Sequence, residues 1–124
     1  MASARVLIVD DHEAVRKALR RLLTAEGYEV CGDAADGTEV IHAVRKHHPD
    51  LILIDLLMPT MSGIDAAREV LAEFPAMLIV LMTTPDPDIL EAAHEAGIRA
   101  TVSKGSGNFV SALDEVLRSE SRHQ

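Results

Sequence analysis

The chain has little cysteine, few aromatic residues and no long apolar run, and each shortage excludes a class of protein. The single cysteine, Cys31, cannot form an internal disulfide, which is consistent with a reducing compartment. Tryptophan is absent and aromatic residues make up 2% of the sequence, so the base-stacking surfaces of proteins that bind RNA or single-stranded DNA are missing. No apolar run approaches the roughly 18 residues of a membrane-spanning helix.

Basic residues are also in the minority. The chain has 12 lysines and arginines against 20 aspartates and glutamates, which gives a formal net charge of -8 at pH 7. This charge opposes non-specific binding to a polyanion such as DNA. We therefore expect protein partners, and neither nucleic acid nor a membrane for this chain by itself. Residues 1–6 show no signal-peptide pattern, so the expected location is cytoplasmic.

Short apolar runs alternate with segments of helical periodicity along the whole chain. The apolar runs predict strands at residues 5–9, 29–35, 50–55, 77–82 and 98–103. The other segments predict helices at residues 12–27, 37–48, 64–74, 88–97 and 108–120. Asp86 as an N-cap and Pro87 at the first helical position both mark the start of the fourth helix. The first helix is expected to turn five apolar residues inward: Val15, Ala18, Leu19, Leu22 and Leu23.

This alternation predicts a doubly wound α/β fold. Because the strands are apolar throughout rather than at every second residue, the sheet should be parallel and covered on both faces, here by five helices. Right-handed crossovers then favour the strand order 2-1-3-4-5. At 124 residues the chain fits one domain over residues 1–124, with a polar tail from about residue 119.

Polar residues follow four of the predicted strands directly. Asp10 and Asp11 follow the first strand, Asp55 ends the third, Thr83 follows the fourth and Lys104 follows the fifth. Each has an ordinary structural explanation, such as a helix cap, a turn residue or a solvated lysine. In a parallel sheet, however, all of them reach the same edge, where open α/β sheets place their chemistry. Such a cleft suits a divalent cation and a phosphoryl group.

The same residues carry a family resemblance. The sequence VDD at residues 9–11, the pattern D-x-x-M-P-x-x-x-G from Asp55 to Gly63, the strand-end Thr83 and Lys104 together resemble the receiver domain of two-component response regulators. The resemblance covers essentially the whole chain and implies the flavodoxin-like sheet order. The segments at 56–63 and 93–104 are most similar to receivers that often precede a helix-turn-helix output domain.

The resemblance implies a magnesium site. In receivers of this kind Asp11 and Asp55 would coordinate Mg²⁺ directly, Asp10 would act through water, and the backbone carbonyl of Leu57 would add a ligand. All of these donors are oxygen atoms, which suit that ion.

The resemblance also implies phosphoryl chemistry. Asp55 would be the nucleophile that accepts a phosphoryl group from a phosphohistidine on a sensor histidine kinase or histidine phosphotransfer protein. Lys104 would neutralise the phosphoryl oxygens, and Thr83 would turn inward to bond them and switch the signalling surface. The chain would then be a signalling protein that catalyses its own phosphorylation and dephosphorylation, not an enzyme acting on other substrates. A phosphorylation-dependent homodimer through the last helices is left open.

The sequence departs from the family pattern at the switch. Thr101 stands where receivers usually carry a Tyr, Phe or His, and Pro85 and Pro87 restrict the loop after the fourth strand. We expect a smaller loop shift on activation than in other receivers. Leu57 and Pro85 offer no group to orient an attacking water, which predicts slow loss of the phosphoryl group. Gly105 replaces the proline often found there, so no cis peptide bond is expected.

Two other functions remain open at this stage. A receiver-like interaction module regulated without phosphorylation would gain no stability from Mg²⁺, and the intact acidic set argues against it. A metal-dependent hydrolase or flavodoxin relative is disfavoured because the first strand-to-helix turn lacks a phosphate-binding glycine loop.

The remaining charged residues are expected to be structural. The histidines show no paired metal-ligand spacing and should be solvated or at helix ends: His12, His42, His47, His48, His94 and His123. A basic cluster on the first helix should be a solvated face: Arg16, Lys17, Arg20 and Arg21. The alternative for this cluster is kinase docking, with Ala14, Val15 and Ala18 as an apolar patch.

Overall fold

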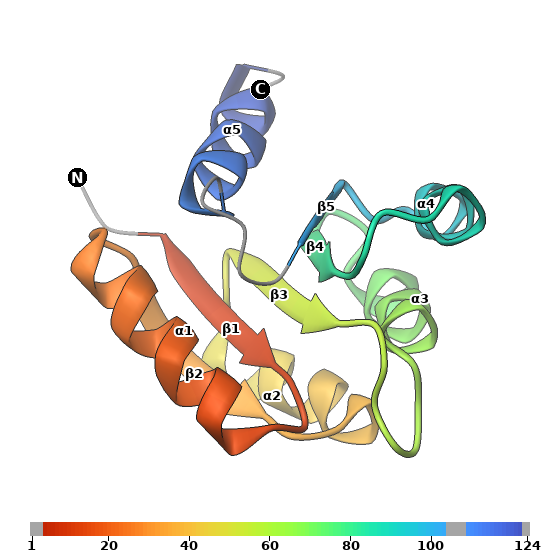
Figure 1. Ribbon diagram of the computed structural model, residues 1–124, viewed down its shortest axis with the longest axis horizontal. Helices are drawn as coiled ribbons and strands as arrows, with labels where there is room; N and C mark the ends of the chain where they lie inside the picture. The colour runs from red at the N-terminus through yellow and green to blue at the C-terminus, as the bar shows by residue number, and fades with distance from the viewer. Residues whose placement is uncertain (1–3, 104–108, 123–124) are drawn as a thin grey trace.

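Strands and helices alternate along the computed structural model, which describes residues 4–103 and 109–122 (Figure 1). The strands are β1 (Arg5–Val9), β2 (Glu29–Ala34), β3 (Leu51–Asp55), β4 (Leu78–Met82) and β5 (Ala100–Val102). The helices are α1 (Glu13–Ala25), α2 (Val40–His47), α3 (Gly63–Glu73), α4 (Pro87–Glu95) and α5 (Phe109–Arg122). A short 3₁₀ helix, η1 (Gly37–Glu39), precedes α2. No helix within these described ranges has the length and apolar character needed to cross a bilayer.

The five strands form one parallel sheet in the order β2-β1-β3-β4-β5, as predicted. Val9, the last residue of β1, lies opposite Ala34 of β2 and Ile54 of β3. Asp55 lies opposite Met82 of β4. Because β1 and β3 are neighbours, residues 10 and 55 reach the same edge of the sheet although they are far apart in the sequence.

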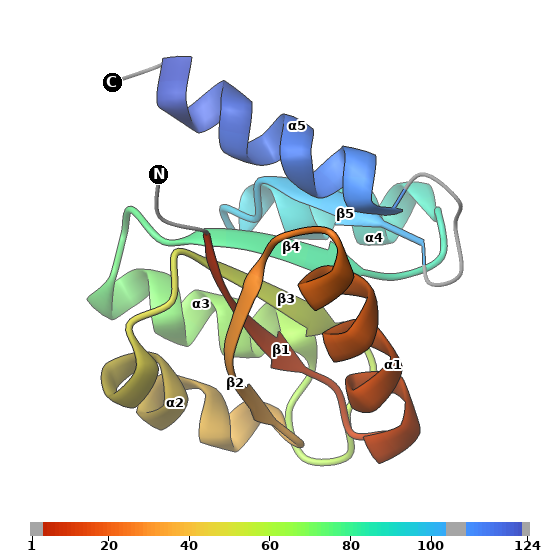
Figure 2. The same ribbon diagram turned by 90° about the vertical axis from the view of Figure 1, so that its left-hand side faces the viewer.

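The sheet is buried on both faces, which explains why its strands are apolar throughout. Alternate strand residues such as Leu7, Val9 and Ile52 face one core, beneath α2, α3 and α4. The residues between them, such as Val6 and Ile8, face a second core beneath α1 and α5. Figure 2 shows these two layers of helices on opposite sides of the sheet. Each fully buried Leu or Ile contributes roughly 1.5–3 kcal/mol to stability relative to an exposed position, so both layers are held firmly.

Local hydrogen bonds set the helix ends. The Oδ1 atom of Asp86 accepts from the backbone N–H groups of Asp88 at 2.9 Å and Ile89 at 3.3 Å, which confirms the predicted start of α4. The Oγ atom of Ser62 accepts from the Asp65 N–H at 3.2 Å, so α3 begins at Gly63, one residue earlier than predicted.

Two details of the predicted helices are wrong. The segment predicted as a helix over residues 37–48 begins as η1, where the Glu39 carboxylate accepts from the Ala35 N–H at 3.0 Å. In α1, Leu23 is completely buried, but Leu22 is 40% exposed and Ala18 is exposed. The inward face of α1 is therefore narrower than its periodicity predicts.

Candidate functional site

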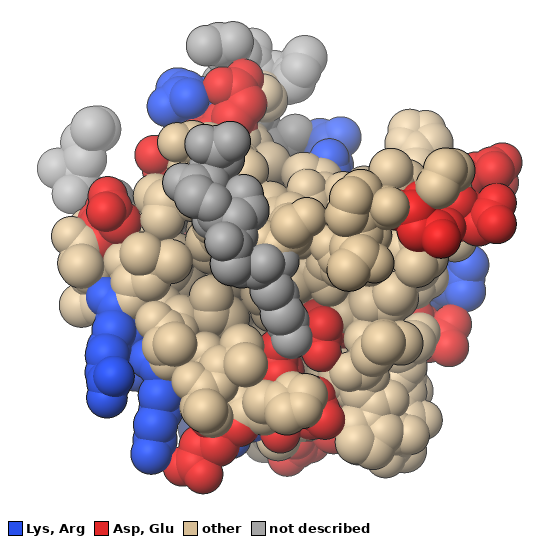
Figure 3. All heavy atoms as spheres, viewed as in Figure 1, with Lys and Arg blue, Asp and Glu red and all other residues tan. Residues whose placement is uncertain are grey.

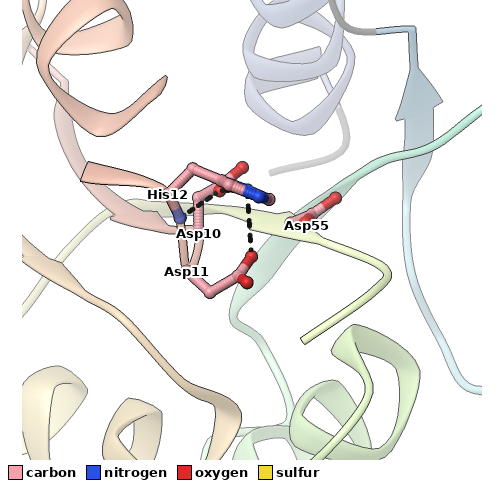
Figure 4. Close-up of side chains that lie close together, drawn as sticks. All are labelled: Asp10, Asp11, His12 and Asp55. Carbon is pink, nitrogen blue, oxygen red and sulfur yellow. Dashed lines mark hydrogen bonds and ion pairs between the residues drawn. The ribbon is translucent and has the colours of Figure 1, made fainter. Parts of the chain in front are cut away.

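The acidic side chains meet at the carboxyl edge of the sheet. Asp10 and Asp11 follow β1 directly, and Asp55 is the last residue of β3. One ligand atom from each of these carboxylates and one from His12 all lie within 4.8 Å of one another. Figure 4 shows the four side chains close together at the ends of β1 and β3. We call the three carboxylates, Asp10, Asp11 and Asp55, the acidic cluster.

The acidic cluster is largely shielded from water. Asp10 is 0% exposed, Asp55 is 7% exposed and the Asp11 side chain is 24% exposed. Two carboxylates about 5 Å apart repel by roughly 3 kcal/mol at an effective dielectric constant of about 20. Three converging carboxylates therefore favour a cation among them, and this donor set fits a small divalent ion that prefers oxygen ligands.

The loop that follows Asp55 returns closely against the end of β3. The N–H of Gly63 donates to the Leu56 carbonyl at 2.8 Å. A Cβ atom at position 63 would lie 2.2 Å from the Asp55 carbonyl oxygen, so only glycine fits there. The glycine of the D-x-x-M-P-x-x-x-G pattern therefore lets α3 start beside the carboxylate.

The same loop is braced against the end of β2. Hydrogen bonding from the Thr60 side chain lowers the pKa of the Asp36 carboxyl. A Cβ atom at Gly37 would lie 2.9 Å from the Met61 carbonyl oxygen, which shows how closely the two loops approach. The loop at residues 56–62 thus packs against the end of β3 on one side and against the loop after β2 on the other.

A cavity of about 300 Å³ opens beside Asp55. It is lined by Asp55, Leu56, Leu57, Met82, Thr83, Thr84, Ile89 and Ser103. The structure therefore brings Thr83 and Asp55 to one cavity, as the sequence predicts. The Thr83 hydroxyl donates to the Thr84 carbonyl at 3.3 Å, and the Leu57 side chain is 75% exposed.

The remaining predicted site residue, Lys104, lies outside the described residues, as does Gly105. The preceding residue, Ser103, lines the cavity. Thr101, at the position of the usual aromatic switch residue, is half-buried in β5.

Sequence reasoning missed the contacts of His12. This residue is exposed and precedes α1, as predicted for the histidines, but its Nδ1 atom also lies 3.2 Å from Oδ1 of Asp10 and 3.2 Å from Oδ1 of Asp11. His12 therefore places an imidazole beside the acidic cluster. Its position directly after Asp10 and Asp11 in the sequence was the available signal.

Arg16 also differs from its prediction as part of a solvated face. Its Nη1 atom donates to the Asp10 carbonyl oxygen at 2.7 Å, its Nε atom lies 3.9 Å from Oδ2 of Asp33, and its side chain is only 17% exposed. Lys17, Arg20 and Arg21 are exposed, as predicted. Figure 3 shows basic side chains gathered over α1 and acidic ones near the carboxyl ends of β1 and β3.

Comparison with protein families gives one match that spans most of the chain. The family described as "Response regulator receiver domain" matches residues 6–113. A transcriptional regulatory protein of Mycobacterium tuberculosis, PdtaR, is 40% identical over 100 residues, which cover 81% of this chain and 49% of that protein. The chemotaxis protein CheY of Thermotoga maritima is 36% identical over 117 residues, covering 92% of this chain and 98% of that protein. This chain thus spans about half the length of PdtaR and nearly the whole of CheY.

Solved structures agree with this match. A two-component response regulator of the LuxR family from Aurantimonas sp. SI85-9A1 superposes with a TM-score of 0.90 at 34% identity, covering 94% of this chain and 86% of that chain. A CheY-like receiver domain protein from Methanospirillum hungatei superposes with a TM-score of 0.89 at 25% identity, covering 98% of this chain and 99% of that chain.

Proposed function

The chain belongs to the response regulator receiver domain family, and from that premise we propose that Asp55 accepts a phosphoryl group in a magnesium-dependent reaction that switches the signalling surface. The observation that carries the proposal is the meeting of Asp10, Asp11 and Asp55 at one edge of the sheet. The donor would be a phosphohistidine on a sensor histidine kinase or histidine phosphotransfer protein. The single parallel sheet supports treating residues 1–124 as one receiver domain.

The acidic cluster would hold the cation. Asp11 and Asp55 would bind Mg²⁺ directly, Asp10 through water, and the Leu57 carbonyl would add an oxygen ligand. The 24% exposure of the Asp11 side chain supports its role as a direct ligand, because the ion reaches the site from solvent. When bound, Mg²⁺ supplies positive charge that offsets the phosphoryl oxygens.

Asp55 would act as the nucleophile. A carboxylate oxygen of Asp55 attacks phosphorus in line, so that an O–P bond forms while the P–N bond to the donor imidazole breaks. The electron pair of that bond stays on the imidazole nitrogen, which takes up a proton from solvent. The low exposure of Asp55 limits the access of water to the acyl phosphate that results. Lys104 would neutralise the phosphoryl oxygens.

Thr83 would change its hydrogen bond in response to phosphorylation. Its hydroxyl now bonds the Thr84 carbonyl, and it lines the same cavity as Asp55. Phosphorylation adds acceptor oxygens and negative charge at Asp55, so the hydroxyl would gain a stronger partner by turning inward.

The accompanying loop shift should be small, because Pro85 and Pro87 each fix their own φ angle and Thr101 carries no ring to swing. Backbone chemical shifts measured with and without a phosphoryl mimic should change mainly around residues 55 and 83. Large changes throughout residues 84–104 would contradict this expectation.

The experiment that tests the function is incubation with a small-molecule phosphodonor and Mg²⁺, followed by intact-mass spectrometry. The wild-type chain should gain the mass of one phosphoryl group, and Asp55→Asn should gain none. Addition of excess EDTA should prevent the gain. An unmodified wild-type chain would overturn the proposal and favour an interaction module regulated without phosphorylation.

A further inference from the structure

The imidazole of His12 stands among the predicted magnesium ligands. We propose that His12 supplies a nitrogen ligand to the cation in the acidic cluster, and that it raises the preference of the site for Mn²⁺ over Mg²⁺. This inference rests on the proposed function, because it requires a cation bound to Asp11 and Asp55. It goes beyond that function by giving the site an ion preference of its own.

The distances fit adjacent ligands of one ion. In an octahedral site with bonds of about 2.1 Å, neighbouring ligand atoms lie about 3 Å apart and opposite ones about 4.2 Å apart. The Nδ1 atom of His12 lies 3.2 Å from Oδ1 of Asp11, one of the proposed direct ligands, and it lies within hydrogen-bonding distance of Oδ1 of Asp10, also at 3.2 Å. The ligand atoms of all four residues lie within 4.8 Å of one another, so Asp55 is also near. His12 thus stands at the spacing of a ligand adjacent to Asp11.

The backbone of His12 holds the residue in this position. Its N–H donates to Oδ1 of Asp10 at 2.9 Å, and its carbonyl accepts from the Arg16 N–H at 3.0 Å in the first turn of α1. Although His12 is the N-cap residue, its side chain makes no capping hydrogen bond. The imidazole is therefore not needed to start the helix and can serve the acidic cluster.

The exposure of the ring suits a ligand that closes the site. The His12 side chain is 65% exposed, whereas Asp10 is completely buried. An ion held by Asp11 and Asp55 would therefore meet the imidazole as its more exposed ligand; Figure 4 shows the ring close to these carboxylates. An exposed ring can also turn aside without disturbing the core, so the cation can enter and leave.

The chemistry of the nitrogen atom predicts the ion preference. Mg²⁺ is a hard ion that takes oxygen ligands and gives up its water reluctantly. Imidazole is a ligand of first-row transition metals, and Mn²⁺ is the member of that series that shares the preference of Mg²⁺ for carboxylate, carbonyl and water oxygens. A neutral imidazole with its proton on Nε2 would present the Nδ1 lone pair to the ion. His12 should therefore strengthen Mn²⁺ binding more than Mg²⁺ binding.

The test compares the full chain with His12→Asn. Asparagine is a favoured N-cap residue, so α1 should still begin at the same place. Isothermal titration calorimetry with Mn²⁺ alone and with Mg²⁺ alone should show that the ratio of Mn²⁺ to Mg²⁺ affinity falls by about tenfold in His12→Asn. The matched control is His42→Asn, which removes an exposed imidazole from α2 and should leave the ratio unchanged.

A spectroscopic measurement tests the ligand directly. Pulsed electron paramagnetic resonance of the Mn²⁺-bound chain should detect a directly coordinated ¹⁴N nucleus in the wild type and in His42→Asn, but not in His12→Asn. An unchanged affinity ratio, or no coordinated ¹⁴N in the wild type, would overturn the role of His12. Failure of the proposed function is a separate outcome, since it is recognised by a wild-type chain that binds no Mg²⁺ and gains no phosphoryl group.

Discussion

Leu57 is the residue that we expect to set the lifetime of a phosphoryl group on Asp55. It lies two residues after Asp55, lines the cavity beside that carboxylate and is 75% exposed. An aliphatic side chain in this place neither packs into the core nor hydrogen-bonds a water molecule. The position is therefore open to substitution without loss of stability.

We predict that Leu57→Asn speeds the loss of the phosphoryl group by roughly tenfold or more, because an amide can orient a water for attack on the phosphorus. The rate would be measured by intact mass after removal of the phosphodonor. Leu57→Ala is the control, since it removes the leucine without adding an amide and should leave the rate near that of the wild type. Equal rates in all three proteins would contradict the prediction.

The solvated position predicted for Arg16 was wrong, and the contacts of His12 were not predicted, each for a physical reason. A solvated face was expected for Arg16 because charged residues at helical spacing are usually exposed. The burial of the Arg16 side chain instead depends on its hydrogen bond to the Asp10 carbonyl, which is available only where β1 ends beside the first turn of α1. The distance of His12 from the carboxylates depends on the geometry of the turn between β1 and α1, although its place directly after Asp10 and Asp11 in the sequence indicated that it would be near. The roles proposed for Asp10, Asp11, Asp55, Thr83 and Lys104 remain predictions.

The ends of helices were predictable where several local sequence signals agree. The Asp86 cap and Pro87 predict the start of α4 correctly, because both act within a few residues of that helix. The helix predicted over 37–48 was less accurate, because the Glu39 side chain bonds the backbone ahead of it and shortens the α-helical part. The packing of α1 depends on which elements cover it, so the exposure of Leu22 could not be predicted from periodicity.

Helix α3 depends on the close approach of Gly63 to β3. We predict that Gly63→Ala destabilises the chain by about 2–3 kcal/mol, because the added Cβ would meet the Asp55 carbonyl oxygen at 2.2 Å and the backbone must move. Urea unfolding monitored by circular dichroism would measure this loss.

Gly27→Ala is the control for that measurement. Gly27 has a φ of +92° but no atom within 4 Å of an added Cβ, so the substitution should cost only about 1–2 kcal/mol from backbone strain. A smaller loss for Gly63→Ala than for Gly27→Ala would contradict the argument from close approach.

A hydrogen bond between Tyr28 and Asp114 ties the start of β2 to α5. The Tyr28 hydroxyl donates to Oδ1 of Asp114, and the ring is 8% exposed. Burial, followed by the bond to Asp114, raises the pKa of Tyr28 well above its ordinary value. We predict that Tyr28→Phe lowers the free energy of unfolding by about 1.5 kcal/mol at pH 7, since a bond to a charged acceptor is lost.

The pH dependence of this effect has a definite sign. A raised pKa in the folded state means that the unfolded chain releases the Tyr28 proton first, so the wild type loses stability relative to Tyr28→Phe as the pH rises above about 10. Urea unfolding at pH 7 and at pH 11 would show the difference between the two proteins shrinking. A difference that grows at pH 11 would contradict the role of the hydroxyl.

For the whole molecule, the strand order was predictable and has been confirmed. Five apolar runs separated by amphipathic segments leave few arrangements once crossovers are right-handed. The convergence of residues 10, 11 and 55 then follows from the pairing of β1 with β3. Side-chain distances within the acidic cluster, by contrast, depend on the packed loops and could not be obtained from the sequence.

A cation that binds only the folded chain should stabilise the whole molecule. We predict that Mg²⁺ at about 100 times its dissociation constant raises the free energy of unfolding by about 2.7 kcal/mol. The measurement is urea unfolding with Mg²⁺ and with EDTA. Asp11→Asn should lose most of this gain, while Glu91→Gln, which neutralises an exposed carboxylate on α4, should keep it. Equal gains in Asp11→Asn and the wild type would contradict a site in the acidic cluster.

The burial of both faces of the sheet has a consequence for how the strands find their alignment. In a strand that is apolar throughout, sliding by one residue exchanges its two faces but leaves apolar side chains in both cores, so hydrophobicity alone hardly opposes the error. Sliding β1 or β3 inward would, however, pull the carboxylate of Asp10 or Asp55 into the apolar interior, which is costly. The carboxylates proposed to bind the cation and accept the phosphoryl group thus also help to fix the register of β1 and β3. Variants meant to abolish phosphorylation should therefore carry a polar amide at these positions, since an apolar substitute would remove the polar group that opposes a register shift as well as the reactive carboxylate.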